Sequence, residues 1–386
     1  MDKRPYNILF HLHTVTGIVI SVLLYVIFFA GSFSFFRSEI IAWERAEPAG
    51  AHGFHLDVDA AIDSLSKRHH LYGRDIAFYK PEGEKRVSVS LSASKDTLAG
   101  KDDTYFYLDT DTYQTYTYEN SYSFGEFLYR LHFFAQIPYP AGYYLSGFTS
   151  LFFLFAILTG ILVHWKKIIP NFWLFRPREK LKTVWTDAHT VLGTIGLPFQ
   201  VVYAVTGAFF MINILLVIPS LFLMYDGDEE KLYDDLGYGE PHFVFENKKL
   251  ASVPPVNGFV TRTTDLWQQF NINEVHIFNY GDNGMHVEVG GELDHSVKFT
   301  GVGHAIFKAS TGEMAEVKNP LDRTSYLDGV KGAMYYLHFG NYGGYSIKVI
   351  SFVLGLITCF VIITGILIWL EARNRKDIPD KTTALQ

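Results

Sequence analysis

The chain has 386 residues, of which 48% are apolar, 16% are aromatic and 19% are charged. This composition is too apolar for a disordered chain and low in charge for a soluble protein. A mean hydropathy of +0.10 is, in turn, too low for a chain that lies wholly in a membrane. The single cysteine, Cys359, excludes intramolecular disulfides, cysteine-ligated iron–sulfur clusters and C-x-x-C-H haem attachment. The net charge of −7 gives no reason to expect nucleic acid as a partner.

Four apolar stretches are long enough to cross a bilayer, which needs about 20 apolar residues. They cover residues 12–36, 143–165, 187–224 and 343–370. The first is too long for a cleaved signal peptide and no A-x-A-like site follows it, so we interpret it as a retained helix. The third is longer than one span needs, and Pro198 and Pro219 are placed to bend it or end it early.

The charges on the connecting segments orient these spans. The link 166–186 carries a strong excess of Lys and Arg, and the two ends, 1–11 and 371–386, are also basic. The positive-inside rule therefore places the link and both termini in the cytoplasm. The long segments 37–142 and 225–342 carry more acidic than basic residues, and we expect them on the outer side.

Both long segments are predicted to be small α+β domains. In the first, residues 57–70 have helical periodicity, and 86–91 and 104–108 alternate as strands do. The second segment repeats this order. It has a helix-like stretch near 258–270, followed by candidate strands at 274–280, 285–289 and 304–309.

The chain is also predicted to be a tandem duplication. Helix one begins His-Thr-Val-Thr-Gly at 13–17 and helix three begins His-Thr-Val-Leu-Gly at 189–193. Eighteen residues after each histidine stands a glycine, Gly31 or Gly207, and eighteen residues are five helical turns. Further copies are Leu-His-Phe at 131–133 and 337–339, and Thr-Gly-Ile-Leu at 159–162 and 364–367.

The duplication singles out four histidines. His13 and His189 lie near the basic side, and His132 and His338 near the other side. Ionisable groups at membrane depth are costly and usually functional. A histidine beside a glycine on a bundle interior suits an iron porphyrin, with two histidines from different helices giving a six-coordinate b-type haem. His164, at the end of helix two, could replace His13 or His189, and the sequence does not decide between them.

These motifs resemble those of the PepSY-associated transmembrane proteins, sometimes called iron-regulated membrane proteins. The resemblance rests on the opening H-x-x-x-G of helices one and three, on Thr-Gly-Ile-Leu, and on Leu-His-Phe-Gly-Asn-Tyr-Gly-Gly at 337–344. The first-half copy, Leu-His-Phe-Phe at 131–134, departs from that signature. The resemblance implies a polytopic α-helical membrane protein with four transmembrane helices in two tandem repeats and two α+β PepSY-like periplasmic domains.

Some members of that family are haem-containing reductases of the bacterial inner (cytoplasmic) membrane that release iron from ferric siderophores. The resemblance therefore implies two haem b groups, with iron ligands at His13, His189, His132 and His338. The implied substrate is a ferric siderophore or other ferric chelate. Such a protein needs no acid–base residue or nucleophile of its own.

Two functions are compatible with these features. The first is a transmembrane electron conduit, an oxidoreductase that reduces ferric chelates outside. Because the chain has no dinucleotide motif, its donor would be a quinol or a separate cytoplasmic reductase. The alternative is a non-enzymatic PepSY membrane anchor that binds or restrains a periplasmic protein.

Overall fold

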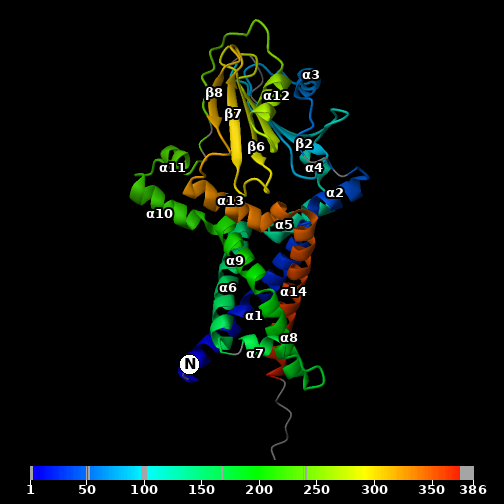
Figure 1. The fold of residues 1–386 in the computed structure, drawn as a ribbon, viewed down its shortest axis with the longest axis vertical. Coiled ribbons are helices and arrows are strands. Elements are labelled where there is room, and N and C mark those ends of the chain that lie inside the picture. Colours follow the sequence, from blue (N-terminus) through cyan, green and yellow to red (C-terminus); the bar gives the residue numbers. More distant parts are fainter. Residues whose placement is uncertain are drawn as a thin grey trace, which may run out of the picture. The chain divides into compact units, whose positions relative to one another are not determined.

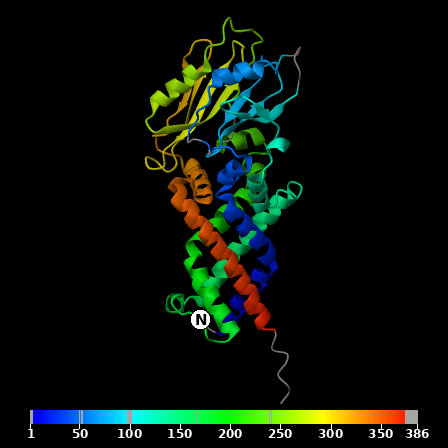
Figure 2. The same ribbon diagram turned by 90° about the vertical axis from the view of Figure 1, so that its right-hand side faces the viewer.

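The computed structural model describes residues 3–48, 50, 53–96, 102–166, 168–237, 239 and 241–373. The expected tail 371–386 is therefore described only as far as Arg373. The chain forms two compact units, which Figures 1 and 2 show in two views. The helical unit consists of Met1–Phe36, Phe127–Asp226 and Met334–Gln386, and the sheet unit of Arg37–Glu126 and Gly227–Ala333.

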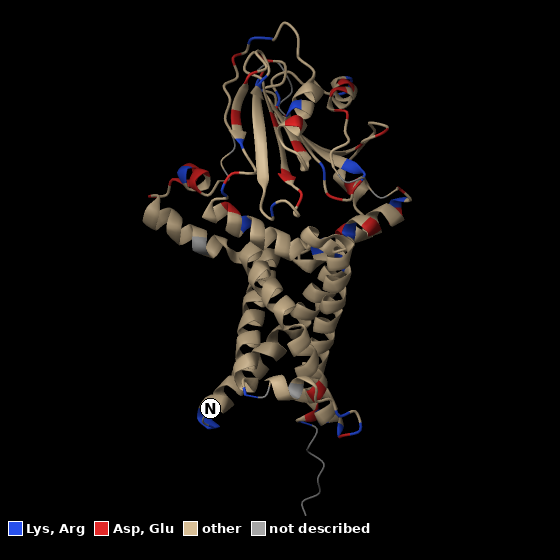
Figure 3. Ribbon diagram, in the orientation of Figure 1, with Lys and Arg blue, Asp and Glu red and all other residues tan. Residues whose placement is uncertain are grey.

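Long apolar helices form the helical unit. Three are long and apolar enough to cross a membrane: α1 (Lys3–Ser34), α6 (Ala141–His164) and α14 (Gly344–Glu371, extended to Asn341 by a 3-10 turn). A fourth candidate is the pair α8 (Leu181–Ile195) and α9 (Leu197–Ile212). In Figure 3, the middle of these helices is almost free of Lys, Arg, Asp and Glu. The described residues thus contain three or four candidate spans, in keeping with a polytopic membrane protein.

The third predicted span, 187–224, is not one continuous helix. Helices α8 and α9 are bent by 69° at Gly196, where Pro198 occupies the first turn of α9. Proline is accepted there because the first turn has no partner for its N–H. A separate helix, α10 (Ile214–Met224), follows Asn213 and contains Pro219. The prediction of one span over 187–224 is therefore wrong for its last eleven residues, which form the separate helix α10.

Two short helices precede α6 and α14, namely α5 (Phe124–His132) and α13 (Tyr326–Phe339). Each carries the histidine of a Leu-His-Phe motif in its last turn. A small helix in the basic link, α7 (Ile168–Phe172), completes the helices that lie in or enter the helical unit. Apolar periodicity did not predict α5 or α13. These two helices carry His132 and His338, which belong to the helical unit.

Small residues bring the long helices together. The core of the helical unit is formed by Ile20, Leu24, Phe28, Phe153, Ile157, Ala204 and Cys359. Around it, a Cβ at Gly355 would overlap Ser32 of α1, and one at Gly207 would press on Ser150 of α6. Close backbone approach at small residues is typical of helix packing in membranes.

One antiparallel sheet of eight strands dominates the sheet unit, with the order β4-β3-β2-β1-β5-β6-β7-β8. The strands are β1 (Ile76–Tyr79), β2 (Arg86–Leu91), β3 (Thr104–Asp109), β4 (Thr115–Tyr116), β5 (Phe270–Phe278), β6 (His286–Leu293), β7 (Val302–Lys308) and β8 (Met314–Lys318). The first four belong to the first long segment and the last four to the second.

The expectation of two separate domains is therefore not met, because strands β1 and β5 join the two segments. Their register runs from Ile76 opposite Ile277 to Tyr79 opposite Glu274. Alone, each segment would present one of these strands as an open edge with unpaired backbone groups. Pairing the two edges satisfies those groups and produces one sheet. From its centre, the strands follow in chain order on both sides, β1 to β4 on one side and β5 to β8 on the other.

Helices α3 (Val58–Ser66) and α12 (Val256–Leu266) pack on the sheet through a shared apolar core, which includes Val58, Leu65, Phe259, Val275 and Phe307. The two helices are also tied directly, because the Asp59 carboxylate accepts the backbone N–H groups of Val256 and Asn257. The sheet unit is completed by α2 (Arg37–Arg45), α4 (Tyr118–Ser121) and α11 (Glu229–Asp235).

Candidate functional site

Two of the four histidines singled out by the duplication form a pair at one end of the helical unit. His13 lies in α1 and His189 in α8, and their ring centroids are 6.2 Å apart with the rings edge to face. The sequence predicted that both lie near the basic side. The structure adds that they face each other from different helices.

Each histidine of this pair is held by a backbone carbonyl of a third or fourth helix. The Nδ1 atom of His13 lies 2.9 Å from the carbonyl oxygen of Ala156 in α6. The Nδ1 atom of His189 lies 2.9 Å from that of Val361 in α14. A carbonyl oxygen only accepts, so each Nδ1 carries the hydrogen and each Nε2 keeps its lone pair. Metal-binding histidines are commonly held in this way.

The repeated Thr-Gly of Thr-Gly-Ile-Leu builds this support in both halves. The hydroxyl of Thr364 donates to the carbonyl of Val361 at 2.8 Å, and the hydroxyl of Thr159 is within hydrogen-bond distance of the carbonyls of Ala156, at 3.0 Å, and Phe155, at 2.9 Å. A Cβ at Gly160 or Gly365 would come within 3.1 Å or 3.3 Å of the adjacent imidazole Cε1. The glycine leaves room for the imidazole, and the threonine fixes the carbonyl that orients it.

The second pair is formed by the Leu-His-Phe histidines. The ring centroids of His132 and His338 are 5.9 Å apart. The Nδ1 atom of His132 lies 2.8 Å from the carbonyl oxygen of Ile27 in α1, one turn before Gly31. A Cβ at Gly31 would overlap the imidazole of His132, so only glycine lets the ring reach this carbonyl.

His338 is held differently from the other three. Its Nδ1 lies 2.7 Å from the hydroxyl oxygen of Thr206, and that hydroxyl donates its own hydrogen to the carbonyl of Val202, also at 2.7 Å. The hydroxyl therefore accepts from Nδ1, and Nε2 again keeps its lone pair. Gly207, the counterpart of Gly31, packs against Ser150. Gly207 therefore does not make room for His338 as Gly31 does for His132.

The glycines one turn after His13 and His189 face open space. A Cβ at Gly17 would meet nothing within 4 Å, and one at Gly193 would meet only Val361, at 3.9 Å. The sequence predicted that these glycines leave room for a flat ring, and the space beside them is compatible with one.

Both separations fit a metal ion between two imidazoles. A nitrogen–metal distance of about 2.0–2.1 Å on each side puts two ring centroids roughly 6 Å apart. Among the residues that the structure describes, no group of three or more His, Cys, Asp or Glu could hold a bare ion. A haem iron needs only two axial protein ligands because the porphyrin supplies the rest. Each pair of facing imidazoles could supply those two ligands.

The family model described as the PepSY-associated TM region matches residues 10–372. The chain belongs to the PepSY-associated TM family. No curated protein matches it. The matched region includes both histidine pairs, all of the sheet unit and most of the helical unit.

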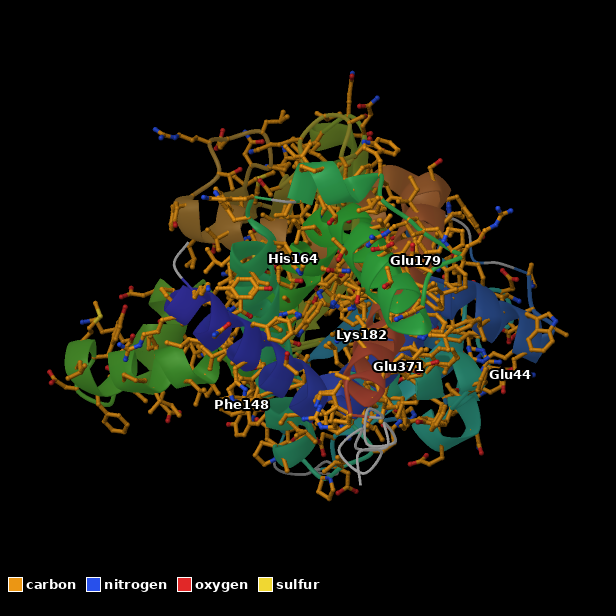
Figure 4. The ribbon with its side chains drawn as sticks, turned by 90° about the horizontal axis from the view of Figure 1, so that it is seen from below. Glu44, Phe148, His164, Glu179, Lys182 and Glu371 are labelled. Atoms are coloured by element: carbon orange, nitrogen blue, oxygen red, sulfur yellow. The ribbon has the colours of Figure 1, made fainter. Side chains whose placement is uncertain are left out.

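In this PepSY-associated TM chain, a third imidazole lies near the first pair. His164 is the last residue of α6 and is labelled in Figure 4, where the chain is seen from below, the end of the helical unit that holds the basic link. It is close enough to His189 for an electrostatic interaction. The facing rings in the structure are nevertheless those of His13 and His189. His11, two residues before His13 in α1, is exposed.

The two pairs lie far apart along the bundle. His13 and Ile27, which holds His132, are separated by fourteen residues of α1, or about 21 Å at 1.5 Å per residue. Aromatic rings fill part of the core between the pairs: the centroids of Phe28 and Phe199 are 6.3 Å apart, and those of Phe199 and Tyr203 are 4.3 Å apart. Tyr203 in turn contacts His338, with 5.3 Å between centroids. The two pairs are thus separate sites, and the side chains packed between them include aromatic rings and buried polar groups such as Gln200 and Thr358.

Proposed function

We propose that this chain is a dihaem electron-transfer protein of the bacterial inner membrane that reduces ferric chelates, such as ferric siderophores, for iron uptake. The observation that carries this proposal is the presence of two facing histidine pairs, each with hydrogen-bonded Nδ1 atoms, about 21 Å apart along one apolar helix. A chain built only to anchor another protein would have no use for two such pairs.

Each pair would hold one haem b. His13 and His189 would bind the first and His132 and His338 the second, with His164 as a further candidate at the first site. The haem supplies reversible one-electron chemistry when bound. The chain orients the imidazoles, excludes water from the path and fixes the separation of the two sites.

The direction of transfer follows from the charge distribution. With the basic link 166–186 and both termini in the cytoplasm, the His13–His189 pair is the donor side and the His132–His338 pair is the periplasmic side. The electron source is a quinol or a separate cytoplasmic reductase. Each electron that leaves the periplasmic side converts one chelated Fe(III) to Fe(II), which hard oxygen ligands hold far less tightly.

A second candidate function has one observation in its favour. Strand β8 ends the sheet, and all five of its residues are exposed. An open edge of this kind can accept a strand from a partner. The chain would then be a non-enzymatic PepSY anchor that restrains a periplasmic protein, with histidines that only pack.

The absorption spectrum of the purified protein separates these functions. From haem-replete cells, we expect a red protein with two haems per chain, b-type bands that sharpen on dithionite, and reoxidation when a ferric chelate is added. A colourless protein would overturn the dihaem proposal and leave the anchor. A red protein that ferric chelates do not reoxidise would retain the haems but overturn the proposed substrate.

A further inference from the structure

The two histidines of the second pair differ in the atom that accepts their Nδ1 hydrogen. His132 donates to the carbonyl of Ile27, whereas His338 donates to the hydroxyl of Thr206. The difference is built into the duplication. Thr206 precedes Gly207, and its counterpart before Gly31 is Ala30, which has no side-chain acceptor.

The acceptor at Thr206 is buried, and its orientation is fixed by a hydrogen bond. The threonine is 1% exposed, and its hydroxyl hydrogen is committed to the carbonyl of Val202. An alcohol oxygen is a weaker acceptor than a peptide carbonyl oxygen. The other three histidines of the two pairs all donate to peptide carbonyls, so His338 has the weakest acceptor of the four.

The strength of this hydrogen bond controls how well the opposite nitrogen donates to a metal. A strong acceptor at Nδ1 makes the imidazole more basic, and a more basic ligand favours the oxidised metal. The His13–His189 pair receives this support on both sides. In the His132–His338 pair, only His132 donates to a peptide carbonyl, and His338 donates to the weaker hydroxyl acceptor.

We propose that Thr206 sets the midpoint potential of the haem held by His132 and His338 above that of the haem held by His13 and His189. This inference rests on the haem ligation proposed above. It makes electron transfer toward the His132–His338 side downhill. Thr206 is accordingly a positioning residue that acts through His338, and the direction of transfer is partly encoded by one threonine that stands where the other half has alanine.

Optical redox titration of the full-length protein in detergent tests this inference. His189→Ala leaves only the second haem and His338→Ala leaves only the first, so each potential can be measured alone. We expect the haem in His189→Ala to have the higher potential. Within that background, Thr206→Val removes the acceptor and raises the potential further, while Thr206→Ser keeps the hydroxyl and leaves the potential unchanged.

Thr364 offers a matched comparison in the other pair. Its hydroxyl lies 3.2 Å from Nδ1 of His189 and orients the carbonyl of Val361, which remains as the acceptor when the hydroxyl is removed. Thr364→Val in the His338→Ala background should therefore shift the potential of the first haem less than Thr206→Val shifts the potential of the second. Thr206→Cys introduces a thiol of similar size that accepts hydrogen bonds more weakly, and it should raise the potential of the second haem as Thr206→Val does. It provides a second test if the Thr206→Val protein does not bind haem.

Two results would overturn the inference. One is a second haem whose potential equals or lies below that of the first. The other is a Thr206→Val or Thr206→Cys protein with the same potential as Thr206→Ser. Failure of the proposed haem ligation is distinguishable from both, because it gives a chain without haem in every variant. Failure of the proposed substrate is distinguishable too, because it leaves both haems and their potentials measurable while ferric chelates do not reoxidise the protein.

Discussion

The imidazole of His132 lies directly against the backbone of α1 at Gly31, and a Cβ at that glycine would overlap the ring. Gly31→Ala should therefore displace His132 from the carbonyl of Ile27 and remove the haem of the second pair. Pyridine haemochrome assay of the purified variant should give about half the haem of the parent, as the two-site proposal requires. Gly258→Ala adds the same methyl group in α12, where it meets nothing within 4 Å, and should bind both haems. Full haem content in Gly31→Ala would contradict the packing argument.

The first pair is tested by single histidine variants. His13→Ala and His189→Ala should each remove one haem and leave the other, because the remaining imidazole supplies only one axial ligand. His164→Ala and the exposed control His11→Ala should keep both haems. Reduced-minus-oxidised spectra provide the measurement. Loss of a haem in His164→Ala, with no effect in His13→Ala or His189→Ala, would assign the first site to His164.

The repetition of short histidine, threonine and glycine motifs was the part of the sequence from which the site could be predicted. It selected His13, His189, His132 and His338 out of fifteen histidines, and the structure places these four in two facing pairs. The groups that orient them could not be predicted. Three are backbone carbonyls, which any residue supplies. The fourth, Thr206, breaks the repeat and so carries no duplicated signal.

The sheet shows a similar division between local and long-range information. The alternation at 86–91 predicted β2 with its observed bounds, and the stretch at 104–108 became β3 with one added residue. Strand β1 has only four residues, too few for an alternation to be detected. Its pairing with β5, about 200 residues later, leaves no local pattern. The prediction of two domains failed because this pairing is a tertiary contact.

The sheet unit should respond to acid through Asp57, which caps α3. Its carboxylate accepts from the backbone N–H of Ala60 at 3.0 Å and from the Asn257 amide at 2.7 Å. These hydrogen bonds lower the pKa of Asp57 below its usual value. Because the folded-state pKa is the lower one, the stabilisation is present above the unfolded-state pKa of about 3.9 and is lost as the pH falls through the folded-state pKa.

Asp57→Ala should therefore lower the free energy of opening of α3 by about 1 kcal/mol near neutral pH. Hydrogen exchange of the α3 amides in the full-length protein, followed by mass spectrometry, measures this quantity. Asp57→Asn is the matched control, because asparagine caps helices well but does not titrate. It should keep most of the protection at neutral pH and lose the acid dependence. An acid dependence that persists in Asp57→Asn would assign it to another group.

The proposed direction of transfer depends on the orientation of the chain. Reporter fusions within the basic link 166–186 and at the C-terminus should report a cytoplasmic location. Fusions near Asp103 or Asn247 should report the periplasm, because these residues belong to the acidic long segments. The reverse pattern would exchange the donor and acceptor sides and place the His13–His189 pair outside.

The proposed reduction of ferric chelates is tested at the second pair. A bis-histidine site leaves no open iron position, so a chelate need only dock near the ring edge to receive an electron. His338→Ala and His132→Ala should both abolish reoxidation of the dithionite-reduced protein by an added ferric chelate. The remaining haem, held by His13 and His189, should still be reducible, because the two pairs are about 21 Å apart along α1. Stopped-flow absorption spectroscopy after excess dithionite is removed follows both sites at once. Full-rate chelate reduction in either variant, with both haems retained, would show that these histidines are not the ligands of the outer site.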